Sequence, residues 1–226
     1  MTLRMAALAV FCVVATSAVA QPVPGTEIDS EQKVYSGSVP IGTPIYEIKY
    51  TTRFLGKDGD VMLTELCTER VRQMQPSCNL VTGQAVLHGV IPVANLKWRT
   101  TDGDRAALAD ALRDAEWTEG LTLPEVDFLP LTDGKTVTWS QAGSTGNVLY
   151  SLTQTCCSTT PSPFDADHEV WILRMEMSRE ETGKILGRAV MRYDAEIGWV
   201  FAQQSSGLEG GRTTSVVLPT ELREPE

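Results

Sequence analysis

The sequence predicts a mainly β protein: a curved antiparallel meander sheet or partial barrel, with one covering α-helix at about residues 102–117. Three observations lead to this prediction. Residues of one size class recur at every second position between 131 and 218, clusters of Gly, Asp, Asn and Ser separate the runs, and one stretch has a helical period. A period of two is typical of strands with one buried face, and strands joined by short links pair antiparallel.

The stretch 131–218 supplies most of the expected sheet. Its runs are 136–140, 148–152, 170–177, 185–193, 199–203 and 214–218. The runs combine small residues such as Gly187 and Ala189 with large ones, a mixture that fills the interior of a strongly curved sheet. We therefore expect aromatic side chains of adjacent strands to point inward and contact an apolar ligand, and these candidate residues are Trp139, Tyr150, Trp171 and Trp199.

The residues before this stretch are expected to extend the sheet. Residues 46–54 alternate between apolar and polar side chains, and a Gly- and Asp-rich turn at 56–60 leads into the returning run 61–71. Two such runs with a short turn between them predict a hairpin.

Gln84 to Trp98 is apolar enough for a further strand. Gly89 and Pro92 interrupt it, and because proline cannot donate to a ladder, we expect an edge or bulged strand. Residues 101–117 follow with a narrow apolar stripe at helical spacing, which predicts a helix that covers an open side of the sheet.

The first twenty residues have the pattern of a secretory signal peptide. Arg4 provides the positive end, residues 6–14 the apolar core, and Ala18-Val19-Ala20 the small-residue cleavage pattern. The apolar run is shorter than the roughly 20 residues that cross a bilayer, so we expect no membrane span. The sequence predicts a periplasmic or secreted protein after cleavage near Ala20.

The remaining chain is expected to comprise a flexible N-terminal arm at 21–40 and a single β-rich domain at 41–220, because the arm is rich in Pro, Gly, Ser and charge. The whole chain has 19 basic and 29 acidic residues. Without Arg4, 18 basic residues remain and the net charge is −11. This balance argues against nucleic acid and against docking on anionic lipid, which both need basic contacts.

Four cysteines remain after the signal peptide: Cys67, Cys78, Cys156 and Cys157. An even number in an exported chain indicates disulfides. We favour two bonds that tie the 67–78 region to the 156–157 pair, because longer closed loops restrict the unfolded chain more. The alternative is a Cys67–Cys78 bond with a vicinal or free pair at 156–157.

The histidine, serine and acidic residues form no recognisable catalytic set. We therefore expect no catalytic residue, metal ion or cofactor. His88 lies in an apolar run, and His168 lies in the acidic stretch 165–169, whose ordinary role is a solvated loop. Carboxylates and an imidazole can also bind a metal. The chain has no Gly-x-Ser-x-Gly elbow and no His near a candidate Ser nucleophile.

Two patterns carry a resemblance to a group of known proteins. Leu131, Gly134-Lys135 and Trp139 open one strand, and Tyr193-Asp194 is followed by Gly198-Trp199. These patterns resemble uncharacterised exported bacterial β-sheet proteins, over about residues 129–202. The resemblance implies an exported sheet protein shaped like the half-barrels that hold lipids.

Non-enzymatic binding of an apolar small molecule, a lipid or a protein partner is therefore the leading functional hypothesis. One alternative is a structural or interaction protein of the cell envelope that uses the edge at 84–98 for strand addition. A second alternative is a hydrolase with a carboxylate site at Asp165, Asp167 and His168.

Overall fold

The computed structural model describes residues 22–37, 39–70, 81–98, 122–143, 146–207 and 213–225. Within these ranges the regular elements are eleven strands. They are β1 (Glu27–Ser36), β2 (Tyr46–Asp58), β3 (Val61–Arg70), β4 (Val81–Leu87), β5 (Ile91–Trp98), β6 (Thr136–Gly143), β7 (Gly146–Thr155), β8 (Val170–Arg179), β9 (Ile185–Asp194), β10 (Trp199–Gly207) and β11 (Thr213–Arg223). The helix predicted at 102–117 lies outside the described residues.

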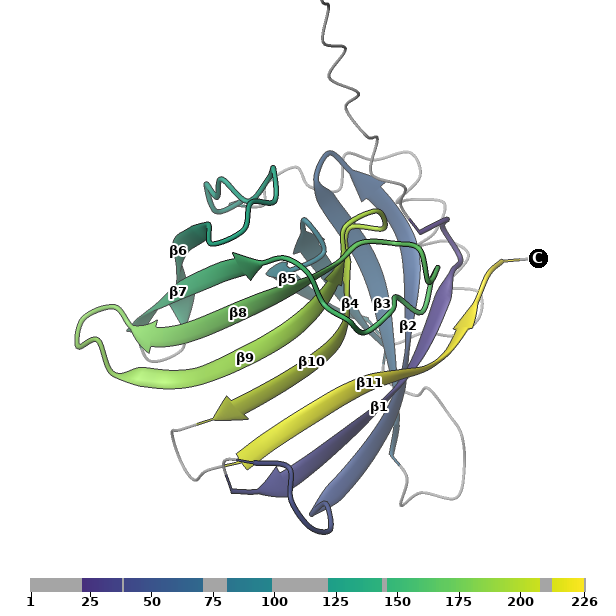
Figure 1. The fold of residues 1–226 in the computed structure, drawn as a ribbon, viewed down its shortest axis with the longest axis horizontal. Coiled ribbons are helices and arrows are strands. Elements are labelled where there is room, and N and C mark those ends of the chain that lie inside the picture. The colour runs from purple at the N-terminus through teal and green to yellow at the C-terminus, as the bar shows by residue number, and fades with distance from the viewer. Residues whose placement is uncertain are drawn as a thin grey trace, which may run out of the picture.

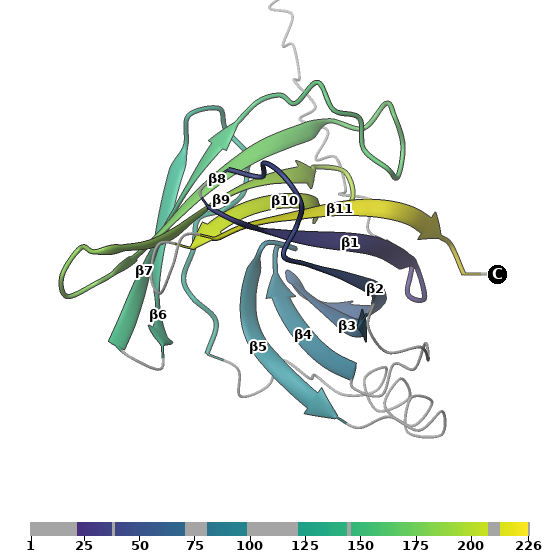
Figure 2. The ribbon, with the colours of Figure 1, turned by 90° about the horizontal axis from the view of Figure 1, so that it is seen from below.

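All eleven strands belong to one antiparallel sheet with the order β5-β4-β3-β2-β1-β11-β10-β9-β8-β7-β6 (Figure 1). The predicted curved antiparallel meander is thus confirmed. The sheet does not close by strand pairing, because β5 and β6 form its two edges. Figure 2 shows that the curvature brings these two edges toward the same side of the molecule, where the side chain of Gln141 on β6 donates a hydrogen bond to the carbonyl of Pro92 on β5 (2.9 Å).

The segment predicted as a loose arm at 21–40 contains a central strand, so that prediction is wrong for Glu27–Ser36. This strand, β1, pairs with β2 on one side and with β11 on the other. Its sequence looks like an arm because polar residues occupy most of its positions. They are nonetheless paired with the sheet: Asp29, for example, accepts a hydrogen bond from Thr51 (2.6 Å).

The single strand predicted for 84–98 is instead a hairpin. β4 and β5 pair antiparallel across a turn at 88–90, where His88 has φ 52° and Gly89 has φ 67°. An added Cβ at Gly89 would lie 1.9 Å from the carbonyl oxygen of Gly198, so this turn packs backbone to backbone against the β9–β10 turn. The predicted edge is correct for β5.

The two ends of the sheet share one hydrophobic core. Phe128, from the segment between β5 and β6, is fully buried at its centre. Its ring stacks on His88 (centroids 5.3 Å apart) and meets Tyr193 edge-on (5.6 Å). The buried members of this cluster are Val61, Ala85, Leu87, Val90, Ile91, Phe128, Val137, Trp139, Leu152, Trp171, Leu173, Ala189, Met191 and Tyr193.

Gln154 on β7 holds the segment that carries Phe128. Its side chain is fully buried, and it donates to the carbonyl of Phe128 (2.8 Å) and accepts from the amide of Thr132 (2.8 Å). A buried amide with both ends hydrogen-bonded avoids the cost of an unsatisfied polar group. The side chain of Gln154 therefore determines where Phe128 enters the core.

We expect Phe128→Ala to lower the free energy of unfolding by about 3–5 kcal/mol, because it leaves a cavity between the two ends of the sheet. Leu129→Ala is the control, because Leu129 is 38% exposed and its truncation should cost much less. Urea unfolding followed by circular dichroism measures both values. Equal losses for the two variants would contradict the central position of Phe128.

Candidate functional site

A groove of about 370 Å³ runs along one face of the sheet. Strand register places its lining from β1, β2 and β11 on the same face, because Gln32 pairs with Ile48 and with Val217. The lining residues are Ile28, Ser30, Gln32, Ile48, Tyr50, Thr52, Leu66, Gln84, Val86, Gly89, Val90, Pro92, Trp199, Val200, Phe201, Ala202, Gln203 and Val217. We refer to this site as the groove.

The groove combines apolar side chains with a few neutral hydrogen-bonding groups. None of its described lining residues carries a charge. Gln32 donates to the hydroxyl of Ser215 (2.7 Å), and burial raises the pKa of Tyr50 to about 12. An uncharged, mostly apolar concavity of this size is typical of a small-molecule site.

β3 and β4 border the groove with one face and the core with the other. Met62 and Val86 pair with each other on the groove face, whereas Leu63 and Ala85 pair on the opposite face. All four side chains are at most 6% exposed. The groove face of these strands contributes Leu66, Gln84 and Val86 to the lining, and the opposite face packs in the core.

The four aromatic residues predicted to bind a ligand lie in two different places. Trp139 stacks on Tyr150 with ring centroids 5.0 Å apart, and both pack with Trp171 in the filled core around Phe128. Trp199 lies elsewhere: its ring meets Phe54 edge-on (4.8 Å), and it lines the groove. Trp199 is thus the one predicted residue that the structure brings to the groove.

Sequence reasoning missed most of the groove. Ile28, Ser30 and Gln32 lie in the segment predicted as a loose arm, and Ile48 and Tyr50 lie on the apolar face of the strand predicted at 46–54. A signal was present, because Ile28 and Val34 alternate with the polar residues Ser30 and Gln32 between them. Two aliphatic residues in ten are too few for such a pattern to predict a strand.

The predicted cross-links between the 67–78 region and the 156–157 pair are wrong, because Cys156 and Cys157 are bonded to each other. Cys67 is also disulfide-bonded, and Cys78 lies outside the described residues. Cys67 lies on β3, and the bonded pair follows β7 in the other half of the strand order.

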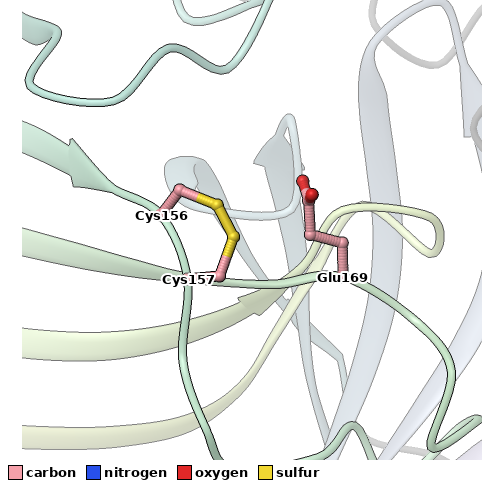
Figure 3. Close-up of side chains that lie close together, drawn as sticks. All are labelled: Cys156, Cys157 and Glu169. Atoms are coloured by element: carbon pink, nitrogen blue, oxygen red, sulfur yellow. A yellow bond between two sulfur atoms is a disulfide. The ribbon is translucent and has the colours of Figure 1, made fainter.

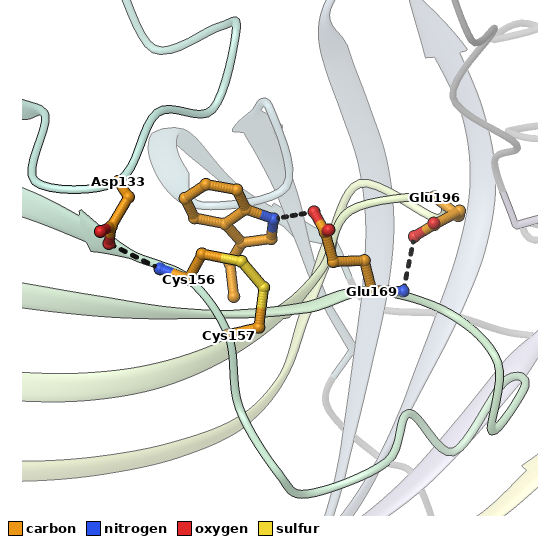
Figure 4. The surroundings of a disulfide bond; sticks show 6 residues. Asp133, Cys156, Cys157, Glu169 and Glu196 are labelled. Carbon is orange, nitrogen blue, oxygen red and sulfur yellow. Dashed lines mark hydrogen bonds between the residues drawn. A yellow bond between two sulfur atoms is a disulfide. The ribbon is translucent and has the colours of Figure 1, made fainter.

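The Cys156–Cys157 disulfide lies close to Glu169 (Figure 3). The amide of Cys156 donates to Asp133 (3.0 Å), and the amide of Glu169 donates to Glu196 (3.1 Å) (Figure 4). Glu169 also accepts a hydrogen bond from the indole of Trp171. Bonded sulfur atoms are not thiolates, and the thiolate is the form that binds metal. The hydrogen bond to Asp133 attaches the start of the loop after β7.

A second cluster of polar side chains in this region surrounds Asp194, which is fully buried. Asp194 accepts hydrogen bonds from the Ser162 hydroxyl, from His168 Nδ1 (2.8 Å) and from the amide of Ile197 (2.8 Å). A hydrolytic triad needs the imidazole between the hydroxyl and the carboxylate. Here Ser162 and His168 both bind the same carboxylate, so the arrangement braces the loop 158–169.

The residues of the carboxylate site predicted at 165–168 do not lie together, because His168 belongs to a different cluster from Asp165 and Asp167. His168 lies with Asp194 and Glu196, and their ligand atoms are within 4.8 Å of one another. Asp165 instead turns its carboxylate back to the amide of Asp167 (3.0 Å). Asp165 and Asp167 thus form a local turn, and only His168 joins the buried carboxylate.

The comparisons with known proteins concern the fold. No family model and no curated protein matches the chain. Among solved structures it is similar to a β-barrel-like protein of domain of unknown function DUF1849 from Brucella abortus, with 8% identity, 91% of this chain and 99% of that chain covered, and a TM-score of 0.45. It is also similar to a LolA superfamily protein from Nitrosomonas europaea, with 10% identity, 92% and 89% covered, and a TM-score of 0.39.

A third similar structure is an outer membrane lipoprotein-sorting protein domain from Vibrio parahaemolyticus, with 8% identity, 90% of this chain and 87% of that chain covered, and a TM-score of 0.34. The expected half-barrel shape agrees with this chain's own curved antiparallel sheet, whose edge strands β5 and β6 do not pair. At these identities and TM-scores, the similarity assigns neither a ligand nor an activity.

In the part of the chain that the structure describes, no helix has the length and apolar character needed to cross a membrane.

The two histidines should titrate on opposite sides of their ordinary pKa of 6.5. Burial lowers the pKa of His88. Burial also opposes the charge on His168, but the hydrogen bond to Asp194 and the charges of Asp194, Glu196 and Asp165 outweigh it and raise the pKa. An NMR titration of the imidazole protons, assigned with His88→Gln and His168→Gln, measures both values.

The signs of the linked stability changes also differ. The stabilisation from His168 should be complete below pH 6.5 and should disappear as the pH rises through its raised pKa. His88 should cost stability as the pH falls from 6.5 through its lowered pKa. Glu196→Gln should lower the pKa of His168 and leave that of His88 unchanged, and a His168 pKa below 6.5 in the native protein would contradict the arrangement.

Proposed function

We propose that this chain is an exported, non-enzymatic binding protein whose groove holds an apolar small molecule or the acyl chain of a lipid. The observation that supports the proposal is the groove itself: about 370 Å³ lined mainly by aliphatic and aromatic side chains. Burial of apolar surface contributes about 25 cal/mol per Å², and the neutral groups Gln32, Gln84 and Gln203 can orient a polar end.

The chemistry of the lining favours an uncharged ligand. A buried charge needs a paired counter-charge, and the described lining has none to offer. The amides and hydroxyls of the lining suit an ester, an amide or an alcohol. The apolar surface and the neutral polar groups of the groove are both accounted for by ligand binding without a chemical step.

Export is part of the proposal. The signal-peptide pattern at 1–20 and the disulfide between Cys156 and Cys157 both suit an oxidising compartment such as the periplasm. The net charge of −11 without the signal peptide favours solubility there.

Strand addition at residues 84–98 is a weaker alternative. β4 is already paired on both sides, so only β5 offers an edge. Part of that edge is engaged as well, because the carbonyl of Pro92 accepts the hydrogen bond from Gln141.

Val217→Trp should reduce ligand affinity at least tenfold, because the indole would fill the groove beside Gln32. Leu218→Trp is the matched control, since Leu218 is the next residue of β11 and is 51% exposed on the other face. Fluorescence titration with the uncharged apolar probe N-phenylnaphthylamine measures binding, and circular dichroism verifies folding. Ile48→Trp blocks the groove from β2 if Val217→Trp does not fold.

The native protein and Leu218→Trp should bind the probe equally. Failure of the native protein to bind any uncharged apolar probe would overturn the proposal. Unchanged affinity in both groove variants would place the binding site elsewhere.

A further inference from the structure

The connection between β1 and β2 carries a group of exposed apolar side chains. Of the nine large apolar residues that are exposed among the described residues, three lie in this connection and a fourth begins β2, and Ile41 is 76% exposed. In Figure 1 the connection is at the lower end of the sheet, where β1 and β2 meet. We call this group the apolar tip, and its members are Val39, Ile41, Ile45 and Tyr46.

The backbone of the apolar tip holds these side chains outward. The amide of Ile41 donates to the carbonyl of Val39 (2.9 Å), and the amide of Ile45 donates to the carbonyl of Val34 (2.7 Å). Pro40 and Pro44 restrict the chain and have no amide to offer to another strand. The tip is therefore a built turn whose apolar residues are presented to the surroundings.

The composition of the tip favours a lipid surface over a protein partner. No charged residue occurs between positions 37 and 46. A stable protein interface needs roughly 800 Å² on each partner with a polar rim, which four side chains on one turn do not supply. Shallow insertion into a bilayer needs only a few apolar side chains, and tyrosine is a preferred residue at the lipid interface.

The tip is continuous with the groove. Tyr46 precedes Ile48 and Tyr50 at every second position of β2, so these three side chains share the groove face. Ile48 and Tyr50 line the groove. A row of apolar side chains thus leads from the exposed end of the sheet into the binding site.

We propose that the apolar tip inserts into the interface of a lipid bilayer and that the groove takes its ligand from that bilayer. The inference deepens the function proposed above and rests on it for the second step. It names the ligand class as the acyl chain of a membrane lipid. Because the net charge without the signal peptide is −11, zwitterionic lipid is the preferred surface and anionic lipid repels the protein.

The test is flotation of residues 21–226 with phosphatidylcholine vesicles. The native protein should float with these vesicles and float less with vesicles that contain phosphatidylglycerol. Each apolar side chain that enters lipid contributes roughly tenfold or more to partitioning, so the double substitution Ile41→Ser and Ile45→Ser should lower the partition coefficient at least tenfold. The matched control is Val190→Ser with Leu218→Ser, which removes two exposed apolar side chains from β9 and β11 and should leave partitioning unchanged.

A second readout separates the tip from the groove. The double tip variant should bind N-phenylnaphthylamine in solution like the native protein but extract a fluorescent fatty acid from vesicles at least tenfold more slowly. Val217→Trp should float normally and extract nothing.

Equal flotation of the tip and control variants, or no flotation of the native protein, overturns the bilayer inference. If a photo-crosslinking amino acid that replaces Ile41 captures a protein and the native protein does not bind vesicles, the inference is overturned in favour of a protein partner. If flotation depends on Ile41 but the groove binds no probe, the insertion of the apolar tip into the bilayer is supported and the proposed function of the groove fails.

Discussion

The pairing of β1 with β11 is the constraint on which the rest of the molecule depends. Among the described strands it is the one pairing between strands distant in sequence, and it joins the meander β1–β5 to the meander β6–β11. Arg223 reinforces it through ion pairs with Glu27 (3.0 Å) and Asp29. Burial opposes ionisation of Asp29, but the hydrogen bonds and charge of Arg223 outweigh it and keep the pKa of that carboxyl low. Without this pairing the groove would lose the floor that β1 and β11 provide together.

The interior of the curved sheet has two regions, a filled core and an open groove. Around Phe128 the space is filled, and Trp139, Tyr150 and Trp171 pack there as core. Along β1, β2 and β11 the lining residues are smaller or polar, and the groove stays open. In the first region Gln154 holds Phe128 in the core, whereas the second region keeps a groove of about 370 Å³. A binding site can therefore exist in a protein whose largest aromatic residues are already used for packing.

Much of the fold could be predicted because short-range periodicity is a local property. Residues 170–177 and 185–193 alternate between large or small apolar and polar side chains, and both are strands. β1 could not be recognised in this way, because most of its positions are polar and partners on both sides supply its hydrogen bonds. The turn at 88–90 was also missed, since its tight geometry depends on the contact between Gly89 and Gly198, which are distant in the chain. The cysteine pairing could not be predicted either, because the spacing of the four cysteines in the chain does not show that Cys156 bonds to its neighbour Cys157.

The sequence by itself determined the class of this protein, an antiparallel β meander with the signature of export, because alternation and turn residues act over a few positions. It also indicated that aromatic residues would gather inside the curve. Only the tertiary structure decided which of them pack and which line a groove, because that depends on the register between β1, β2 and β11 and on where Phe128 enters. It also decided that Asp194, from the end of β9, gathers Ser162 and His168, because those residues meet only when the loop after β7 folds back over the sheet.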